Sequence, residues 1–153
     1  YKRHVPDLTW AHFERWRRGV DNWEVGDGLA QWVMAVWMLA EPETRLEHLW
    51  RLIADEDVWS RRLALVTTTG LNRIRKGVCF PDLTLALVDR VKTERHPMIT
   101  QAVSWALRAL GEREPHTVAA YLEENRAALA SHVVREVENK LRTGLKSGKA
   151  HNR

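Results

Sequence analysis

A chain of 153 residues, with 44% hydrophobic and 29% charged residues, is long enough to form one domain around a real hydrophobic core. Cys79 is its single cysteine, which excludes an internal disulfide framework and a cysteine-based zinc site and is typical of a reducing compartment. The longest apolar run, residues 32–40, is too short to span a bilayer. We therefore expect a cytoplasmic protein, and we expect no membrane partner.

The formal net charge is +4, and arginine supplies most of the 24 lysine and arginine residues. Arginine is favoured where a planar guanidinium meets phosphate or carboxylate oxygens, and its abundance favours a polyanionic partner. A GC-rich coding sequence would produce the same bias, so composition alone leaves both explanations open.

Hydrophobic periodicity predicts an all-α protein, because no stretch alternates long enough between apolar and polar residues to indicate a strand. The prolines lie at helix boundaries. In chain order, the predicted helices span residues 8–18, 22–39, 43–53, 56–69, 81–93, 97–110, 115–128 and 131–145. Gly19, Gly70 and Gly111 are predicted to follow helix ends. Residues 146–153 are basic and poor in apolar side chains, which predicts a disordered tail.

The second predicted helix begins with two side chains of particular interest. Asp21 followed by Glu24 resembles a capping box, which predicts a helix start near Trp23. Trp23 and Asp27 are four residues apart and share one helical face. An indole beside a carboxylate suits a cationic ligand. The alternative is a core tryptophan beside an aspartate that complements the helix dipole.

Short similarities recur along the chain with a spacing of roughly 40 residues. Asp21-Asn22-Trp23 recurs as Asp57-Val58-Trp59, and the segment after Trp59 aligns with the segment after Ile99. Each period contains two predicted helices, which is typical of HEAT-like repeats that stack into a curved α-α superhelix. The helices at 22–39, 56–69 and 97–110 would then line one concave face. An irregular helical bundle is the alternative.

Three motifs on these equivalent helices resemble the successive signatures of the AlkD-like DNA alkylation repair family. They are Asn22-Trp23 with Asp27, Trp59 with Arg61-Arg62 and Ala64, and Gln101-Ala102-Val103-Ser104-Trp105-Ala106-Leu107-Arg108. The similarity runs from about Thr9 to Lys140. The resemblance implies a HEAT-like-repeat DNA glycosylase that removes cationic alkylpurines, such as 7-methylguanine and 3-methyladenine, from duplex DNA.

The resemblance also implies roles for individual residues. Asp27 would be the catalytic carboxylate, and Trp23 and Trp105 would be aromatic walls against the sugar of the lesion nucleotide. Arg62 would hold the DNA backbone near the lesion, with Arg61 as the other reading of the Trp-x-Arg-Arg pattern. Further contacts to DNA are expected from Trp59, Arg108, Arg73, Arg75 and Lys76. For the cluster at residues 73–76, a role in solubility alone is equally compatible with the sequence.

The chemistry of the implied reaction fits this small set of residues. An N7- or N3-alkylated purine is already cationic and leaves as a neutral base without a general acid. Cleavage of the glycosidic bond develops oxocarbenium character at the sugar, which a nearby carboxylate stabilises. The reaction requires no metal or cofactor, and the seven histidines show no ligand spacing. The resemblance also implies a nucleoid-associated protein whose concave surface grips the duplex without enclosing the lesion in a deep base-flipping pocket, unlike most enzymes that act on bases.

The predicted organisation is a single HEAT-like domain over residues 1–145, without the family's first helical pairs, followed by the basic tail. Two other functions compete with catalysis: a non-catalytic relative that binds damaged or branched DNA, and a scaffold for protein partners. The remaining tryptophans are expected to fill the core or to cover an apolar flank through which a homodimer would form; they are Trp10, Trp16, Trp32, Trp37 and Trp50.

Overall fold

The computed structural model describes residues 3–149, and helices make up its regular structure. This described part contains no strand, so the prediction of an all-α protein is confirmed. The helices are the short turn η1 (Val5–Asp7), α1 (Trp10–Arg17), α2 (Trp23–Leu29), the π-helix η2 (Ala30–Met34), α3 (Ala35–Ala40), α4 (Pro42–Arg45), α5 (His48–Ile53), α6 (Val58–Arg73), α7 (Pro81–Val91), α8 (Pro97–Gly111), α9 (Pro115–Asn125) and α10 (Ser131–Thr143).

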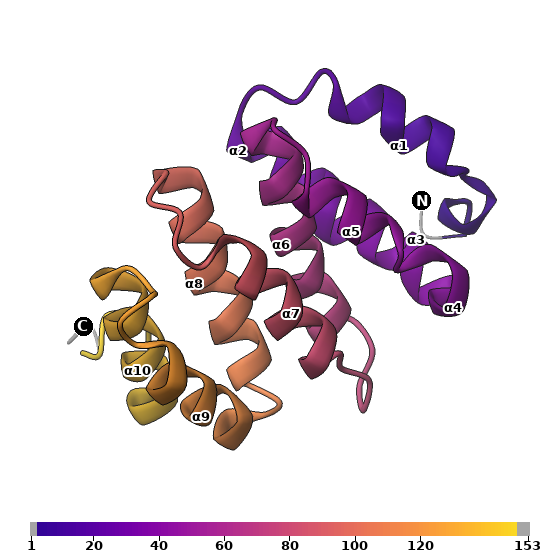
Figure 1. Ribbon diagram of the computed structural model, residues 1–153. Helices are drawn as coiled ribbons and strands as arrows, with labels where there is room; N and C mark the ends of the chain where they lie inside the picture. The colour runs from indigo at the N-terminus through magenta and orange to yellow at the C-terminus, as the bar shows by residue number, and fades with distance from the viewer. Residues whose placement is uncertain (1–2, 150–153) are drawn as a thin grey trace.

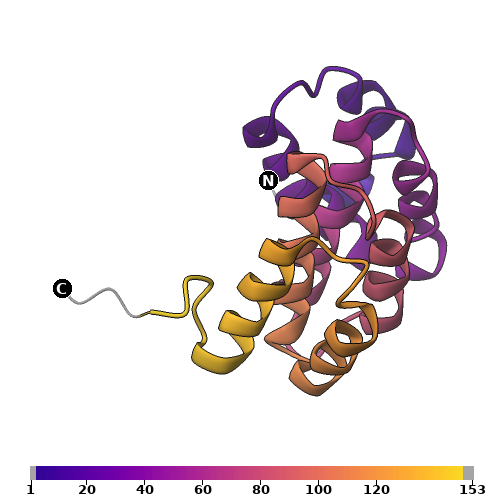
Figure 2. The same cartoon turned by 60° about the vertical axis from the view of Figure 1, so that its left-hand side comes forward.

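The helices stack as successive hairpins in two layers (Figure 1). We call α5, α7 and α9 the outer layer, and the continuous unit α2–η2–α3 together with α6, α8 and α10 the inner layer. Within the inner layer α6 packs between η2 and α8, and α8 packs between α6 and α10. Figure 2 shows α8 and α10 side by side, with α9 on their outer side. This stacking confirms the predicted helical-repeat solenoid, and it places the helices predicted at 22–39, 56–69 and 97–110 in one layer.

The start of α2 follows the prediction, but its cap does not. The helix begins at Trp23, and the Asn22 side chain caps it by accepting a 3.0 Å hydrogen bond from the Val25 amide. Asp21 instead accepts a hydrogen bond from the Asn22 amide group. The predicted capping box of Asp21 with Glu24 is therefore wrong. Both Asp and Asn are favoured at the N-cap position. Asn22 is the N-cap because it directly precedes Trp23, the first residue of the helix.

Gly70 has a packing role that differs from the predicted one. It lies inside α6, four residues after Val66, and does not follow the end of the helix. A Cβ atom at Gly70 would lie 2.6 Å from the Ala35 Cβ and 2.9 Å from the Gln31 carbonyl oxygen. The glycine is therefore explained by the close approach of α6 to η2 and α3. Gly111 likewise is the last residue of α8, whereas Gly19 does follow α1, as predicted.

Most aromatic side chains of the N-terminal part belong to the core. Phe13 is fully buried, and its ring contacts the rings of Trp10, Trp16 and Trp37. The ring of His48 stacks on Trp10 with their centroids 4.1 Å apart. We call these five residues the aromatic cluster. It joins α1 to α3 and α5. The prediction of core tryptophans therefore holds for Trp10, Trp16 and Trp37, while Trp32 and Trp50 are exposed.

The end of α10 turns back on itself. Gly144 adopts the left-handed conformation with φ of 76°, which a glycine accepts without strain. The Asn139 side chain then donates a 3.1 Å hydrogen bond to the Lys146 carbonyl. Residues 150–153, the last part of the predicted tail, lie outside the described residues. Within residues 3–149, no helix is long and apolar enough to cross a membrane.

Candidate functional site

Asp27 and Arg62 form a nearly buried, two-point ion pair between α2 and α6. The Arg62 Nε atom donates to Asp27 Oδ1 at 2.9 Å, and Nη2 donates to Oδ2 at 2.7 Å. Asp27 is only 8% exposed and Arg62 5% exposed. A paired fork of this kind fixes the plane and direction of both groups, because two parallel hydrogen bonds leave little rotation.

The third arm of Arg62 reaches the next inner helix. Its Nη1 atom donates to the Met98 carbonyl in the first turn of α8 at 2.7 Å. Arg62 therefore joins α2, α6 and α8, and it has three of its five N–H donors occupied within the protein. Two N–H donors of Arg62 remain, and the predicted contact with the DNA backbone would depend on them.

Arg61, the neighbouring residue, points into a different environment. It donates to the carbonyls of Asp55 and Glu56 in the loop before α6 and pairs with Glu94 in the loop between α7 and α8. The consecutive arginines thus separate, because residues one apart on a helix face different ways. Arg61 does not line the groove that contains Arg62, whereas both arginines were candidates for the same role from sequence.

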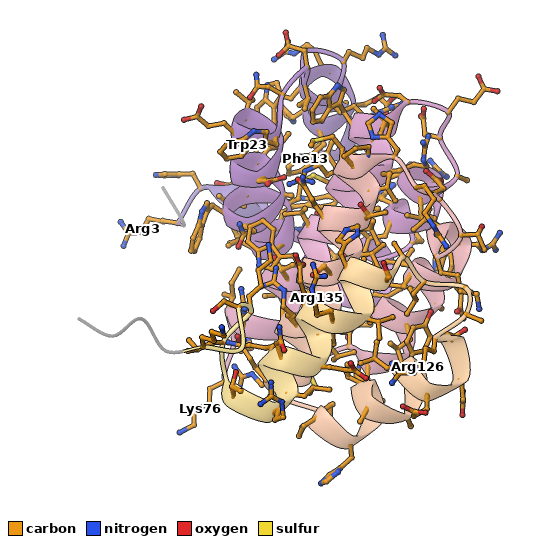
Figure 3. The ribbon with its side chains drawn as sticks, turned by 90° about the vertical axis from the view of Figure 1, so that its left-hand side faces the viewer. Arg3, Phe13, Trp23, Lys76, Arg126 and Arg135 are labelled. Carbon is orange, nitrogen blue, oxygen red and sulfur yellow. The ribbon has the colours of Figure 1, made fainter. Side chains whose placement is uncertain are left out.

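The two predicted aromatic walls, Trp23 and Trp105, lie on different inner helices, α2 and α8, and both of these helices pack against α6. Trp23, one turn before Asp27 on α2, is 56% exposed and lies on the surface of the molecule (Figure 3). Trp105 is partly buried on α8 and lines the same groove as Arg62. The groove therefore brings together Arg62 and Trp105, whereas neither Trp23 nor Asp27 lines it.

An open groove of about 490 Å³ runs from Arg62 along α8 to α10. We call it the cationic groove. Its charged and titratable lining residues, apart from Glu136, are basic. The lining residues are Arg62, Arg95, Pro97, Thr100, Gln101, Trp105, Arg108, His132, Glu136 and Lys146. Several fixed positive charges in one concave surface attract a polyanion.

The predicted residue Arg108 lies on the wall of this groove. Its Nε atom donates to the Ser104 hydroxyl, and that hydroxyl donates to the Glu136 carboxylate from α10. Burial lowers the pKa of the Arg108 guanidinium, and Glu136 partly offsets this effect. Arg108 nevertheless stays charged at neutral pH, since arginine ordinarily titrates above pH 12. Lys146 is 3.4 Å from the other Glu136 oxygen.

Of the remaining predicted DNA contacts, Arg73, Arg75 and Lys76 lie at or after the C-terminal end of α6, whereas Trp59 lies at its N-terminal end. Arg73 forms a two-point pair with Glu112 at 2.8 and 3.0 Å, and Lys140 also contacts Glu112. Although burial opposes it, the hydrogen bonds from these two cations lower the pKa of Glu112. Arg75 and Lys76 are exposed in the loop that follows, and Trp59 is partly buried in the first turn of α6.

Sequence reasoning missed Arg95, Glu136 and Lys146 as groove residues. Arg95 follows α7 and Lys146 lies in the segment assigned to a disordered tail, so neither shares a motif or a helical face with the other candidates. Glu136 was indistinguishable from other helical glutamates. Over residues 3–149, His, Cys, Asp and Glu side chains form no group of three with the spacing of a metal site.

Comparison with known proteins adds an independent observation to this geometry. The sequence model of the family described as "DNA alkylation repair enzyme" matches residues 1–141. This match includes the Asp27–Arg62 pair, both aromatic walls and most of the cationic groove. A search of curated protein sequences gave no significant match.

Proposed function

Because the chain belongs to the DNA alkylation repair enzyme family, its role is in the repair of alkylated DNA, and we propose that it is a DNA glycosylase. The proposed substrates are cationic alkylpurines in duplex DNA, such as 7-methylguanine and 3-methyladenine. The observation that carries the proposal is the Asp27 carboxylate, held by Arg62 where that arginine enters the cationic groove. Trp23 is one turn earlier on α2, and Trp105 lines the groove.

The reaction we propose is hydrolysis of the bond between C1′ of the sugar and the purine nitrogen. The base leaves with the bonding electrons and becomes neutral, because alkylation has already given it a positive charge. Positive charge then develops on C1′ and the ring oxygen. Water adds to C1′ and loses a proton, which leaves an abasic sugar. No metal or cofactor enters this sequence, since the leaving group needs no further activation.

Asp27 is the residue suited to the developing charge. A carboxylate offers about four acceptor positions, and Arg62 uses one on each oxygen. The free positions remain for an oxocarbenium-like sugar and for an attacking water. Because the two-point pair holds the carboxylate in place before substrate arrives, little reorganisation is needed as the transition state forms.

The aromatic walls and the groove supply substrate binding. An indole face attracts a cation by about 0.5–2 kcal/mol, depending on how far water is excluded. Trp23 and Trp105 are therefore suited to the charged nucleotide and its sugar. Basic residues along the groove, including Arg95, Arg108 and Lys146, are suited to the phosphates of the duplex. The groove is open, which suits a reaction on a nucleotide that is not enclosed in a deep pocket.

One observation favours a second candidate function. Asp27 is almost buried, and both of its oxygens accept hydrogen bonds from Arg62. A carboxylate held in this way also suits a purely structural pair that joins α2 to α6. In that case the chain would bind damaged or branched DNA through the same groove without cleaving the glycosidic bond.

Release of free base from a defined lesion separates these functions. A duplex with one N7-methylguanine is incubated with excess protein, and the released base is quantified. We expect release above the spontaneous rate, and we expect Asp27→Asn to lower it by on the order of 10²–10³-fold while most DNA affinity remains. Glu24→Gln is the matched control, because it removes an exposed carboxylate from the same turn of α2. Salt-sensitive binding without release would support the second function, and neither binding nor release would indicate a protein scaffold.

A further inference from the structure

Trp32 is an exposed aromatic side chain that the proposed reaction does not use. It lies on η2 and is 52% exposed. Among the described residues its ring forms no aromatic pair and no cation–π contact, whereas exposed Trp50 on the outer layer has the Arg90 guanidinium over its ring. Apolar surface left open to water costs free energy, and tryptophan, with its apolar ring and its polar N–H group, is enriched at binding surfaces.

Trp32 lies within the π-helix η2, which follows α2 without a break. A π-helical turn contains more residues than an α-helical turn, so it changes the direction in which the following side chains leave the helix. Such turns are frequent at functional sites. The position of Trp32 in η2 is therefore a second feature, beside its exposure, that marks this segment.

Trp32 borders a notch between η2 and the C-terminal half of α6. The notch has a volume of about 310 Å³ and is lined by Gln31, Trp32, Thr69, Gly70, Arg73 and Ile74. This volume is at the lower end of the range for small-molecule sites. Gly70 contributes no side chain here, because a Cβ atom would collide with the Gln31 backbone. The notch therefore has one aromatic wall, a mostly apolar floor and one cationic side chain.

Arg73 lines this notch and lies on α6, the helix that also carries Arg62 of the cationic groove. The two arginines are eleven residues apart, about three turns, so they share one face of the helix and are separated by ~16 Å along its axis. This separation is several times the rise of about 3.4 Å for one nucleotide step in a duplex strand. The notch therefore lies on the α6 face that holds the Asp27–Arg62 pair, yet too far away to contact the same nucleotide.

The charge around the notch is positive. Arg73 and Lys140 share the single carboxylate of Glu112, which leaves one positive charge in excess. Arg75 and Lys76 add two exposed cations in the loop directly after α6. Lys76 and Trp23 lie along the same side of the molecule, the side of the inner layer (Figure 3). An aromatic face with cations at its edge is the arrangement that binds a base together with its phosphate.

We propose that the Trp32 notch binds an unpaired nucleobase of the DNA, stacked on the indole, with its phosphate near Arg73 and the 75–76 loop. This second nucleic-acid site rests on the proposed DNA-binding function, but not on glycosylase activity. It gives the protein a preference for duplexes in which a nucleotide outside the lesion site is extruded. Distorted DNA is then recognised at two points on one face.

The experiment compares two duplexes, one fully paired and one with a single-nucleotide bulge, and measures their dissociation constants. Base–aromatic stacking contributes a factor of about 5–150 in affinity, so the wild type is expected to bind the bulged duplex at least about 5-fold more tightly. Trp32→Ala is expected to bring this ratio close to one, whereas Trp32→Phe keeps an aromatic face and most of the ratio. Trp50→Ala, the matched control on the outer layer, leaves the ratio unchanged.

A second measurement uses the wild type alone, so that folding of a variant cannot decide the result. A bulge with 5-iodouracil is photocrosslinked, and the crosslinked peptide is expected to contain Trp32. Three results would contradict the proposed binding of a base in the Trp32 notch: an affinity ratio near one for the wild type, an unchanged ratio in Trp32→Ala, or a crosslink elsewhere. A Trp32-dependent preference without release of N7-methylguanine would contradict the glycosylase proposal but would support base binding in the notch.

Discussion

Where α1 packs against α3 and α5, Trp10, Trp16 and Trp37 surround the buried ring of Phe13, whereas Trp23 and Trp32 on the inner layer are more than half exposed. The same side chain fills a core in one region and presents a face to solvent in the other. In the aromatic cluster the indoles exclude water and even hydrogen-bond internally, since Trp37 Nε1 donates to the Leu8 carbonyl at 2.7 Å.

The difference shows that the environment of a tryptophan, and not its residue type, decides whether it stabilises the fold or is available to bind a ligand. Core aromatics contribute through buried area and ring–ring packing. Exposed indoles beside arginines contribute little to folding, and their surface is available to a ligand. Substitutions in the two regions are therefore expected to affect different measurements, which makes the comparison testable.

The largest expected effect comes from exchanging a core ring and an exposed one for alanine. Phe13→Ala is expected to lower the free energy of unfolding by about 3–5 kcal/mol, because it leaves a cavity among packed rings. Trp23→Ala is expected to change it by less than ~0.5 kcal/mol, while base release falls about 2- to 30-fold with loss of cation attraction. Urea unfolding followed by circular dichroism and the base-release assay measure the two effects. Equal destabilisation by both variants would assign Trp23 to the core.

The next prediction tests whether the Asp27–Arg62 pair contributes both to the stability of the fold and to base release. Arg62→Ala leaves the Asp27 carboxylate buried without its partner, and we expect a loss of about 3 kcal/mol in unfolding free energy. Base release is expected to fall on the order of 10²-fold, since Asp27 loses its orientation. Unfolding in urea and single-turnover release of N7-methylguanine give the two values.

Arg61→Ala is the control for this prediction, because Arg61 is the adjacent residue on α6 and pairs with Glu94 outside the groove. We expect it to retain base release. A double variant, Asp27→Ala with Arg62→Ala, is expected to be more stable than Arg62→Ala alone, because no buried charge is left unpaired. If the double variant were the less stable of the two, the pair would not be the source of the destabilisation.

The smallest effect concerns pH and the aromatic cluster. Burial of His48 against Trp10, and to a lesser extent Arg51, lowers the pKa of its imidazole. The unfolded chain then takes up a proton on His48 at higher pH than the folded chain. The contribution of His48 to the free energy of unfolding is therefore fully present above about pH 6.5 and declines as the pH falls below that value. We expect a lower thermal midpoint at pH 5 than at pH 7. His48→Gln is expected to reduce that difference, and an unchanged difference would show that other groups cause it.

Local patterns in the amino-acid sequence predicted much of the architecture. Helical periodicity and proline positions predicted every long helix, and the repeat spacing predicted that α2, α6 and α8 are neighbours. The spacing of four residues between Trp23 and Asp27 likewise predicted that they share one face of the helix. By contrast, the Asn22 cap, the π-helix that contains Trp32 and the close approach at Gly70 depend on how helices fit together. Composition and periodicity contain no signal for them.

The sequence by itself determined the helices, their order in a repeat and the candidate residues on each one, because these depend on interactions within a few turns of chain. Tertiary structure alone decided which candidates meet. Asp27 and Arg62 are 35 residues apart, and helix packing chose Arg62 over Arg61 as the partner of Asp27. It also brought Arg95, Glu136 and Lys146 into the groove and left Trp32 open beside Arg73. Long-range contacts depend on crossing geometry and close packing of many side chains at once, which no local pattern encodes.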